Sequence, residues 1–365
     1  MRNAFLEVMR GGKPEKIVWT ADLTYWVAGQ IQAGRGRPEW NTEMGHLALC
    51  RDLGCMPYYW YEHLTVAAPH YDGVTVRTEV KGNRRTQTWQ TPVGRLVMEI
   101  TALPETSSEA ITKYPIENGD DADVFLYLLK HRRWMPCHLD TYRERMNRWA
   151  PFDGVPPAAL PRSPLPSLFC EWAGVQNGIY LLTDFPWKIR EMLALMEQQE
   201  EPIVEALVRT APPVVHFTDN LSSDNLASLF DEFMETPYRR RLARLHAAGI
   251  RCVVHLDGTV RGLLPKLAAV GFDAVEALTP QPVGDVGLHE MRSVAGRRDL
   301  VLWGGVPGAM FAHPFTWKDM EAHIKKLLEH WTGTPFIVGV ADQVPPDGDI
   351  EFVRRISEML KGRRP

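Results

Sequence analysis

The C-terminal half of the chain alternates short apolar strands with helices, and this pattern constrains the fold more than any other feature. Apolar runs of strand length begin near residues 214, 251, 274, 300 and 336, and a helical stretch follows each of them. The helix predicted from Thr316 onward has a capping box with Asp319 and an apolar stripe at helical spacing. Repeated strand–helix units of this length form a parallel sheet with right-handed crossovers.

The length of the chain and the absence of a glycine-rich phosphate-binding turn favour a closed (β/α)8 barrel over an open parallel sheet. The chain has 365 residues, enough for a complete (β/α)8 barrel. No Gly-x-Gly-x-x-Gly turn follows any strand, which disfavours an open dinucleotide-binding sheet. We therefore expect an α/β fold, a single-domain (β/α)8 TIM barrel over residues 1–365, with an N-terminal helical extension.

Three less regular stretches interrupt the N-terminal half. The first barrel strand is expected within 17–22. A β-hairpin insertion is expected over 73–102, around the turns at Gly82–Asn83 and Thr91–Gly94. A proline-rich loop, 151–166, is expected to precede a strand near 168–171.

Composition excludes several classes of protein. The formal net charge is −4 and no basic patch suggests nucleic acid. No apolar run approaches the roughly 20 residues that a membrane span needs, and the N-terminus lacks the apolar core of a signal peptide. The five cysteines are scattered, so a disulfide framework is not expected. We expect a cytoplasmic protein with reduced thiols that binds neither nucleic acid nor a membrane.

Polar side chains follow the predicted strands, at the end where a (β/α)8 barrel carries its chemistry. His255 and Asp257 are two residues apart after one strand and so point to the same face. Glu276 follows on the next strand, and Asp342 follows the last. One nitrogen and three carboxylates suit a hard or borderline divalent metal, and they suit acid–base catalysis without a metal equally well. Asp22, His216, Asn220 and the pair Gly304–Gly305, where backbone could approach a ligand, end other strands.

Several short motifs occur in a definite order along the chain. They are an N-terminal helix leading into 12–17, the turn Thr91–Gly94, the sequence His255-Leu256-Asp257-Gly258, the pair Gly304–Gly305, and Val344-Pro345-Pro346. In this order they resemble the uroporphyrinogen decarboxylase superfamily. The resemblance implies a (β/α)8 barrel and a relation to the cobalamin-dependent methyltransferases that the superfamily includes.

The decarboxylase branch fits the chain less well than the methyltransferase branch. Gln32–Arg35 resembles the end of the Arg-Gln-Ala-Gly-Arg segment with which decarboxylases bind the carboxylates of their substrate, but Ile31 replaces the leading arginine. Tyr58–Glu62 lacks the essential aspartate of those enzymes, and an acidic rim opposes binding of a tetrapyrrole with several carboxylates. Uroporphyrinogen decarboxylase, a carboxy-lyase of porphyrin biosynthesis in which Arg35 binds substrate, remains the alternative.

The methyltransferase branch contains two kinds of enzyme, and the chain resembles the second. Thiol-activating members bind zinc through a His-x-Cys pair and a later Cys, whereas here Asp257 replaces the first Cys and 339–342 contains none. The remaining resemblance is to enzymes that move a methyl group from a donor, such as a methoxylated aromatic, to the cobalt of a separate corrinoid protein. It implies O-demethylation, with cobalamin carried by that partner.

The strand-end positions and the resemblance together suggest roles for individual residues. His255, Asp257 and Glu276 are expected to be catalytic and, with Asp342, to bind zinc or another divalent metal. The donor is expected to contact Asp22, His216 and Asn220, and a pocket lined by the aromatic residues Trp19, Trp26, Tyr59, Trp60 and Trp172. A homodimer is compatible with the sequence. A hypothesis of another class is a ligand-binding barrel without catalysis, whose acidic rim is structural.

Overall fold

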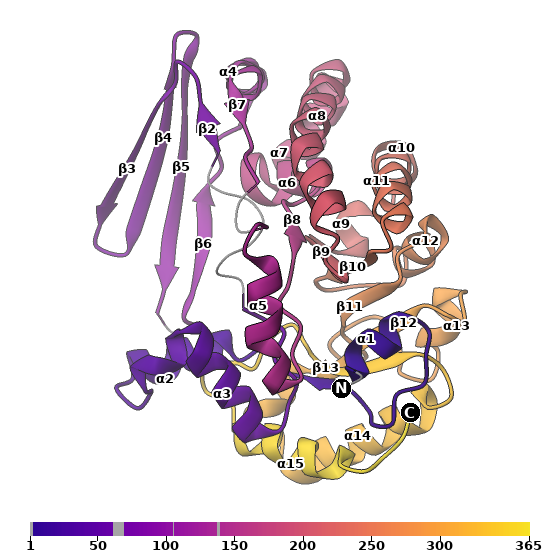
Figure 1. The fold of residues 1–365 in the computed structure, drawn as a ribbon. Coiled ribbons are helices and arrows are strands. Elements are labelled where there is room, and N and C mark those ends of the chain that lie inside the picture. The colour runs from indigo at the N-terminus through magenta and orange to yellow at the C-terminus, as the bar shows by residue number, and fades with distance from the viewer. Residues whose placement is uncertain (1–2, 61–68, 105, 137–138) are drawn as a thin grey trace.

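A parallel seven-stranded sheet forms the centre of the computed structural model, which describes residues 3–60, 69–104, 106–136 and 139–365 (Figure 1). The strand order is β1-β13-β12-β11-β10-β9-β8. The bounds are β1 (Trp19–Thr20), β8 (Ala159–Leu160), β9 (Val214–Leu221), β10 (Arg251–Leu256), β11 (Ala274–Leu278), β12 (Val301–Pro307) and β13 (Phe336–Ala341).

The segment that starts at Met56 lies where the remaining barrel strand belongs. Met56 forms a parallel bridge with Thr20, and its N–H donates to the carbonyl of Trp19 at 2.8 Å. Among the described residues the ladder is not closed between this segment and β8. The strands and helices nevertheless have the order of a (β/α)8 barrel, and the predicted fold class is confirmed.

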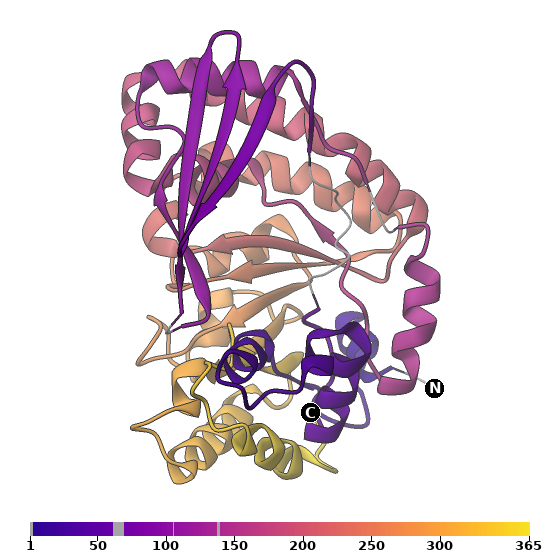
Figure 2. The same cartoon turned by 90° about the vertical axis from the view of Figure 1, so that its left-hand side faces the viewer.

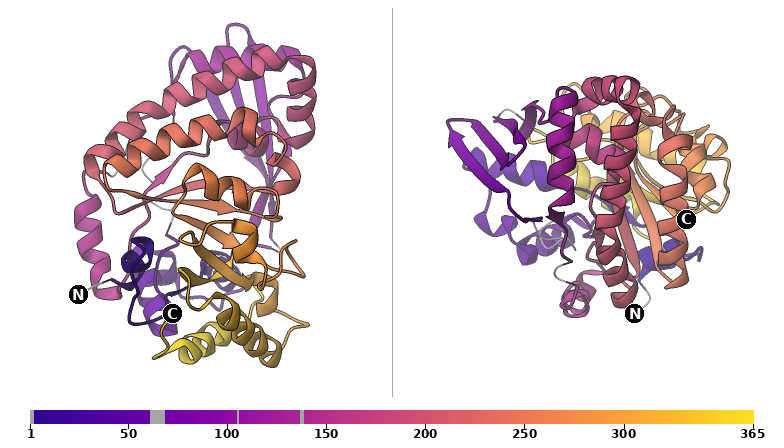
Figure 3. Two further views of the ribbon diagram at one scale, coloured as in Figure 1. Left: turned by 90° about the vertical axis from the view of Figure 1, so that its right-hand side faces the viewer. Right: turned by 90° about the horizontal axis from the view of Figure 1, so that it is seen from above.

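Helices cover the outside of the barrel, as Figure 3 shows from two sides. After β1 come α2 (Thr24–Gln32), η1 (Pro38–Asn41) and α3 (Glu43–Leu53). The later covering elements are α8 (Pro186–Thr210), α9 (Ser223–Leu226), α10 (Phe230–Phe233), α11 (Glu235–Ala247), α12 (Leu264–Val270), α13 (Met291–Ala295), η4 (Gly308–Phe311), α14 (Trp317–Trp331) and α15 (Glu351–Leu360). No helix among the described residues is both long enough and apolar enough to span a membrane.

Strand alternation divides the core into an inner and an outer layer. Val214, Val253 and Trp303 belong to the inner cluster, and helix α1 (Ala4–Met9) closes its lower end with Phe5, whose ring lies 5.2 Å from that of Trp303. Side chains of opposite parity pack outward against the helices. Because residues two apart share a face, the inner parity continues from Val214 to His216 and from Val253 to His255.

The insertion is a four-stranded antiparallel sheet that stands beside the barrel (Figures 1 and 2). Its strands are β3 (Thr75–Lys81), β4 (Arg84–Thr91), β5 (Gly94–Leu103) and β6 (Ser108–Lys113), so β6 lies beyond the range 73–102 that the sequence suggested. The short strand β2 (His70–Tyr71) precedes this sheet. Between the sheet and α8 lie α4 (Gly119–Lys130), β7 (Arg132–Arg133), α5 (Tyr142–Trp149), η2 (Ala150–Phe152), α6 (Pro164–Ser167), the π-helical η3 (Leu168–Trp172) and α7 (Gly174–Asp184). The assignment of residues 1–365 to one domain stays a prediction.

The strand expected near 168–171 is wrong. That segment is helical and continues α6, while the barrel strand β8 lies within the proline-rich stretch assigned to a loop. Pro164 and Pro166 occupy the first turn of α6, where a missing N–H costs no helical hydrogen bond. A short apolar run does not by itself distinguish a strand from a buried helix.

Two glycines let β12 pack closely against its neighbours, Gly304 against β11 and Gly305 against α14. Gly304 and Gly305 have φ values of 133° and 89°. A Cβ on Gly304 would lie 2.6 Å from the backbone nitrogen of Leu278 and 2.8 Å from its carbonyl oxygen. The close approach expected at this pair is therefore to a neighbouring strand at Gly304 and to the side chains of Leu327 and Trp331 at Gly305, rather than to a ligand.

Replacing Gly304 with alanine is expected to lower the free energy of unfolding by about 3 kcal/mol or more, because left-handed strain and a backbone clash add. Gly296→Ala is the matched control, since Gly296 has φ 67° and a Cβ there would meet no heavy atom within 4 Å. That control should cost only about 1 kcal/mol. Equal losses in urea unfolding of the two variants would contradict this account of β12.

Candidate functional site

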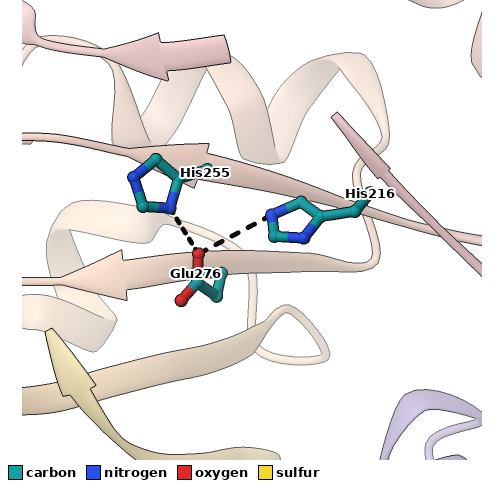
Figure 4. Close-up of side chains that lie close together, drawn as sticks. All are labelled: His216, His255 and Glu276. Carbon is teal, nitrogen blue, oxygen red and sulfur yellow. Dashed lines mark hydrogen bonds and ion pairs between the residues drawn. The ribbon is translucent and has the colours of Figure 1, made fainter. Parts of the chain in front are cut away.

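Three neighbouring strands bring His216, His255 and Glu276 together inside the barrel (Figure 4). In the parallel ladder His255 is in register with Glu276, and His216 is in register with Val253. His255 Nδ1 lies 2.6 Å from Glu276 Oε2, and His216 Nε2 lies 3.6 Å from the same oxygen. Glu276 is 0% exposed, so it belongs to the barrel interior rather than to an open rim.

Tyr59 satisfies the other oxygen of Glu276. Its hydroxyl donates to Glu276 Oε1 at 2.8 Å and lies 3.4 Å from Thr20 Oγ1, which accepts a hydrogen bond from Trp303 Nε1 at 2.8 Å. Both oxygens of a buried carboxylate are thus paired, as burial of a charge requires. The network fixes the orientation of Glu276 from the side opposite the two histidines.

Electrostatics make His255 and Glu276 an ion pair. Burial lowers the pKa of His255, but the charge of Glu276 and its hydrogen bond outweigh burial and raise that pKa to about 9. Burial raises the pKa of Glu276, but His255 outweighs it and the pKa is lowered. Burial lowers the pKa of His216 to about 4 despite Glu276. The cluster therefore holds a cationic His255, an anionic Glu276 and a neutral His216 near neutral pH.

Further carboxylates lie close enough to this cluster to interact with it electrostatically. Burial, and then Asp257 and Glu276, raise the pKa of Asp342, while His255 opposes the shift. Burial raises the pKa of Asp22 to about 7, although Thr24 donates its N–H and its hydroxyl to Asp22 Oδ1 at 2.9 and 2.7 Å. These mutual effects show that the acidic side chains predicted from separate strands act on one another.

Asp22→Asn is expected to make the protein more stable at about pH 8 and to leave stability little changed at about pH 4. The folded pKa of Asp22, about 7, lies above its ordinary value of 3.8, so wild-type stability is lost as pH rises between these values. The asparagine oxygen still accepts the bonds from Thr24. Thermal unfolding at both pH values measures the effect, and exposed Asp52→Asn is the control. A D22N difference that does not depend on pH would contradict burial of the Asp22 charge.

Tyr25 belongs to the same region and was not among the sequence candidates. Burial raises the pKa of its phenol, and Asp342, Asp22 and Asp257 raise it further. Its position on α2, three residues after Asp22, gave no signal, because an aromatic residue in a helix is usually part of the core. Thr20 could have been identified, since it shares the inward parity of Asp22.

Several predicted pocket residues lie elsewhere. Trp19 is adjacent to Thr20, so strand alternation directs it to the outer core. Trp60 packs with Leu47 and Trp149 in a separate cluster. Arg35 is exposed after α2, where its Nε donates to Gln30 Oε1 at 3.0 Å. Asn220 is half-buried near the end of β9 with φ 51°.

Two further aromatic candidates are also engaged outside the cluster. Trp26 donates its indole N–H to the carbonyl of Gly348 at 3.1 Å. The ring of Trp172 lies 5.1 Å from that of Trp89 and 4.5 Å from that of Phe125. Tyr59 is the member of the predicted aromatic set that contacts Glu276.

The donor set at the centre of the site fits a divalent metal. Ligand atoms of His216, His255 and Glu276 lie within 4.8 Å of one another, and His216 Nε2 is buried without a hydrogen-bond partner among the described residues. Two imidazoles and one carboxylate suit zinc or a similar ion. The sequence grouped Asp257 and Asp342 in this set, but both lie outside the compact group. Both side chains reach solvent, and neighbouring groups desolvate Asp342 only in part. Metal binding itself stays a prediction.

The displacement of Asp257 and Asp342 has a local cause. Val254 and Leu256 keep the same outward parity, but β10 ends at Leu256, so Asp257 lies one residue beyond the strand and is exposed. Asp342 has φ 70° at the end of β13, which turns the backbone away from strand geometry.

Comparison with known proteins identifies relatives of the C-terminal half and of the whole fold. The sequence model of the family described as uroporphyrinogen decarboxylase (URO-D) matches residues 182–362. A search of curated proteins found no match.

Two solved structures share the fold over nearly the whole chain. A methyltransferase from Methanosarcina mazei superposes with a TM-score of 0.63 at 16% identity, covering 97% of this chain and 96% of that one. A B12-independent methionine synthase from Shewanella sp. W3-18-1, in complex with selenomethionine, gives a TM-score of 0.50 at 9% identity, covering 95% and 96%.

Proposed function

Since the chain belongs to the uroporphyrinogen decarboxylase superfamily, we propose that it is a methyltransferase of that superfamily. Its methyl donor is a small methoxylated aromatic compound, and its methyl acceptor is the cobalt of a corrinoid protein. The observation that carries the proposal is the acidic surrounding of the buried His255–Glu276 pair.

The charge of the site favours this substrate class over a porphyrinogen. The largest charge effects on Asp22 and Tyr25 come from carboxylates, and those on Asp342 come from His255 and carboxylates. A tetrapyrrole with several carboxylates needs several cationic partners. Arg35, the cation that a decarboxylase would use, is exposed and bonded to Gln30. A neutral methyl ether avoids this repulsion.

The residues of the site can assist departure of the aryl oxygen. Breaking a methyl–oxygen bond requires the leaving oxygen to be protonated or metal-coordinated. Asp22 has a pKa of about 7 and so retains a proton on a large share of molecules near neutral pH. Glu276 and Tyr59 hold His255 in one orientation, which positions a cationic imidazole beside the reacting group.

Two further groups complete this chemistry. A corrinoid, when bound by its carrier protein, supplies the methyl acceptor. A divalent ion held by His216, His255 and Glu276 would supply a Lewis acid in place of the cationic imidazole, because His255 must lose its proton to bind a metal. Asp257 and Asp342 would then tune the charge of the mouth, since both already raise the pKa of His255.

The proposal is tested by metal analysis of the purified protein, combined with a screen of methoxylated aromatic compounds in the presence of reduced cobalamin. We expect a demethylated phenol that forms only when reduced cobalamin is present, and loss of activity when a chelator removes the metal. Full activity of metal-free protein would remove the metal from the proposal. Binding of the donor without turnover would favour the ligand-binding barrel instead.

Decarboxylation is the second candidate because the matching family model carries that name. It predicts conversion of uroporphyrinogen without any requirement for cobalamin, so the same protein preparation separates the two functions.

A further inference from the structure

Strand β3 forms an open edge of the inserted sheet. It is the terminal strand in the order β3-β4-β5-β6, and all seven of its residues are exposed. Within the described ranges, no strand pairs with its outer side. Figures 1 and 2 show the sheet projecting beside the barrel, with β3 on its outside. An edge of this length with unpaired backbone groups is a template for strand addition.

The turn that joins β3 to β4 determines which backbone groups are free. Lys81 and Arg84 are paired across a two-residue turn, Gly82–Asn83, and the closing pair of such a hairpin is a hydrogen-bonded pair. Residues of the same parity as Lys81 therefore direct their N–H and C=O groups toward β4. The groups of Val76, Thr78 and Val80 point to the open side.

The sequence of β3 is complementary to itself when reversed. It reads Thr-Val-Arg-Thr-Glu-Val-Lys from Thr75 to Lys81. In antiparallel pairing of two copies centred on Thr78, Arg77 of each copy lies opposite Glu79 of the other, and Val76 lies opposite Val80. In-register parallel pairing would instead place Arg77 against Arg77 and Glu79 against Glu79. Opposite charges across strands stabilise a sheet, and like charges destabilise it.

We propose that this edge is a homodimer interface, in which the β3 strands of two copies pair antiparallel about a two-fold axis at Thr78. The backbone groups that face outward are those that a hydrogen-bonded Thr78–Thr78 pair requires. Val76 and Val80, which are 38% and 68% exposed, cover each other on one face. Arg77 and Glu79 pair on the other face, where Glu79 also lies 3.6 Å from Lys81 of its own chain.

A second copy fits this edge better than an unrelated strand. Self-complementarity makes the contact isologous, so it closes at two copies and leaves no β3 edge open for further addition. The interface involves one strand from each copy and is small, so we expect reversible association that depends on protein and salt concentration. The inference is independent of the proposed enzymatic function, because β3 belongs to the insertion and contributes no residue to the His255–Glu276 site.

Sedimentation equilibrium of the full chain over a range of concentrations tests the proposal by charge exchange. The wild type should dimerise. R77E and E79R should each weaken the dimer about tenfold, because each places like charges in both symmetry-related pairs. The double variant R77E/E79R should restore the wild-type affinity, and an equimolar mixture of the two single variants should form a mixed dimer. R95E, the same charge change at an exposed position on β5, should leave the dimer unchanged.

Thr78→Pro gives a second test that does not depend on charge. It removes an outward N–H without removing a bond to β4, so the sheet should persist by circular dichroism while the dimer is lost. A wild type that remains monomeric at all concentrations would overturn the proposal. So would a dimer that all of these variants leave unchanged.

Discussion

Replacement of Glu276 by glutamine is expected to reduce methyl transfer by about a thousandfold, the scale typical of a lost charged group in a preorganised site. The glutamine oxygen still accepts the bond from Tyr59, so the shape of the site is preserved. The charge that holds the proton on His255 is lost, and the pKa of His255 should fall. Initial rates of phenol formation from the methoxylated donor measure the effect.

Glutamine is a better test than alanine at this position. The sequence placed Glu276 at the rim of the barrel, but the side chain is fully buried and contacts Tyr59 and His255. An alanine would leave both partners unpaired in the interior. A loss of activity could then result from a loss of stability, and the two effects could not be separated. Glu329→Gln, at an exposed position of α14, is the control. An E276Q variant with more than about a tenth of wild-type activity would contradict a central role for the carboxylate.

His255→Ala is expected to lower the free energy of unfolding by about 3 kcal/mol near neutral pH, because it leaves Glu276 as a buried charge without its cationic partner. The double variant H255Q/E276Q removes both charges and should recover much of this loss while remaining inactive. Urea unfolding followed by tryptophan fluorescence measures all three proteins. Equal stability of H255A and wild type would show that the pair is not charged in the folded protein.

The cost of His255→Ala should depend on pH in a defined direction. The folded pKa of His255, about 9, lies above its ordinary value of 6.5. The stabilisation is therefore complete below about pH 6.5 and is lost as pH rises through about 9. The pKa of Glu276 is lowered, so its part is present above its ordinary value of 4.5 and is lost in acid. The difference between wild type and H255A should thus be largest near pH 6 and small at pH 10.

The strand pattern of the C-terminal half was sufficient to predict the barrel and the proximity of His255 to Glu276. Both residues end apolar runs on consecutive strands, and consecutive strands of a parallel barrel are neighbours. The same alternation could have excluded Trp19, which has the opposite parity to Thr20 and Asp22. Strand parity therefore indicates the direction of a side chain as well as its position along the barrel.

Other parts of the site depend on structural features that cannot be predicted from the pattern of apolar strands. His216 completes the compact group from β9, before the point where the register between β9 and β10 shifts, whereas Asp257 lies beyond the last residue of β10. The contact of Tyr59 with Glu276 depends on the segment after Met56, which bridges β1 by an isolated pair rather than a regular ladder. Such shifts are set by packing against neighbouring strands, which one-dimensional patterns do not record.

The central claim is that the buried His255–Glu276 pair serves methyl transfer to a corrinoid. It is tested most directly by following methylcobalamin formation when the purified protein is mixed with reduced cobalamin and the methoxylated donor, with uroporphyrinogen supplied in a parallel reaction. The wild type should form methylcobalamin, E276Q should form it about a thousandfold more slowly, and neither protein should form coproporphyrinogen. The central claim would be contradicted if the protein converted uroporphyrinogen to coproporphyrinogen without forming methylcobalamin, and if E276Q did so at the same rate.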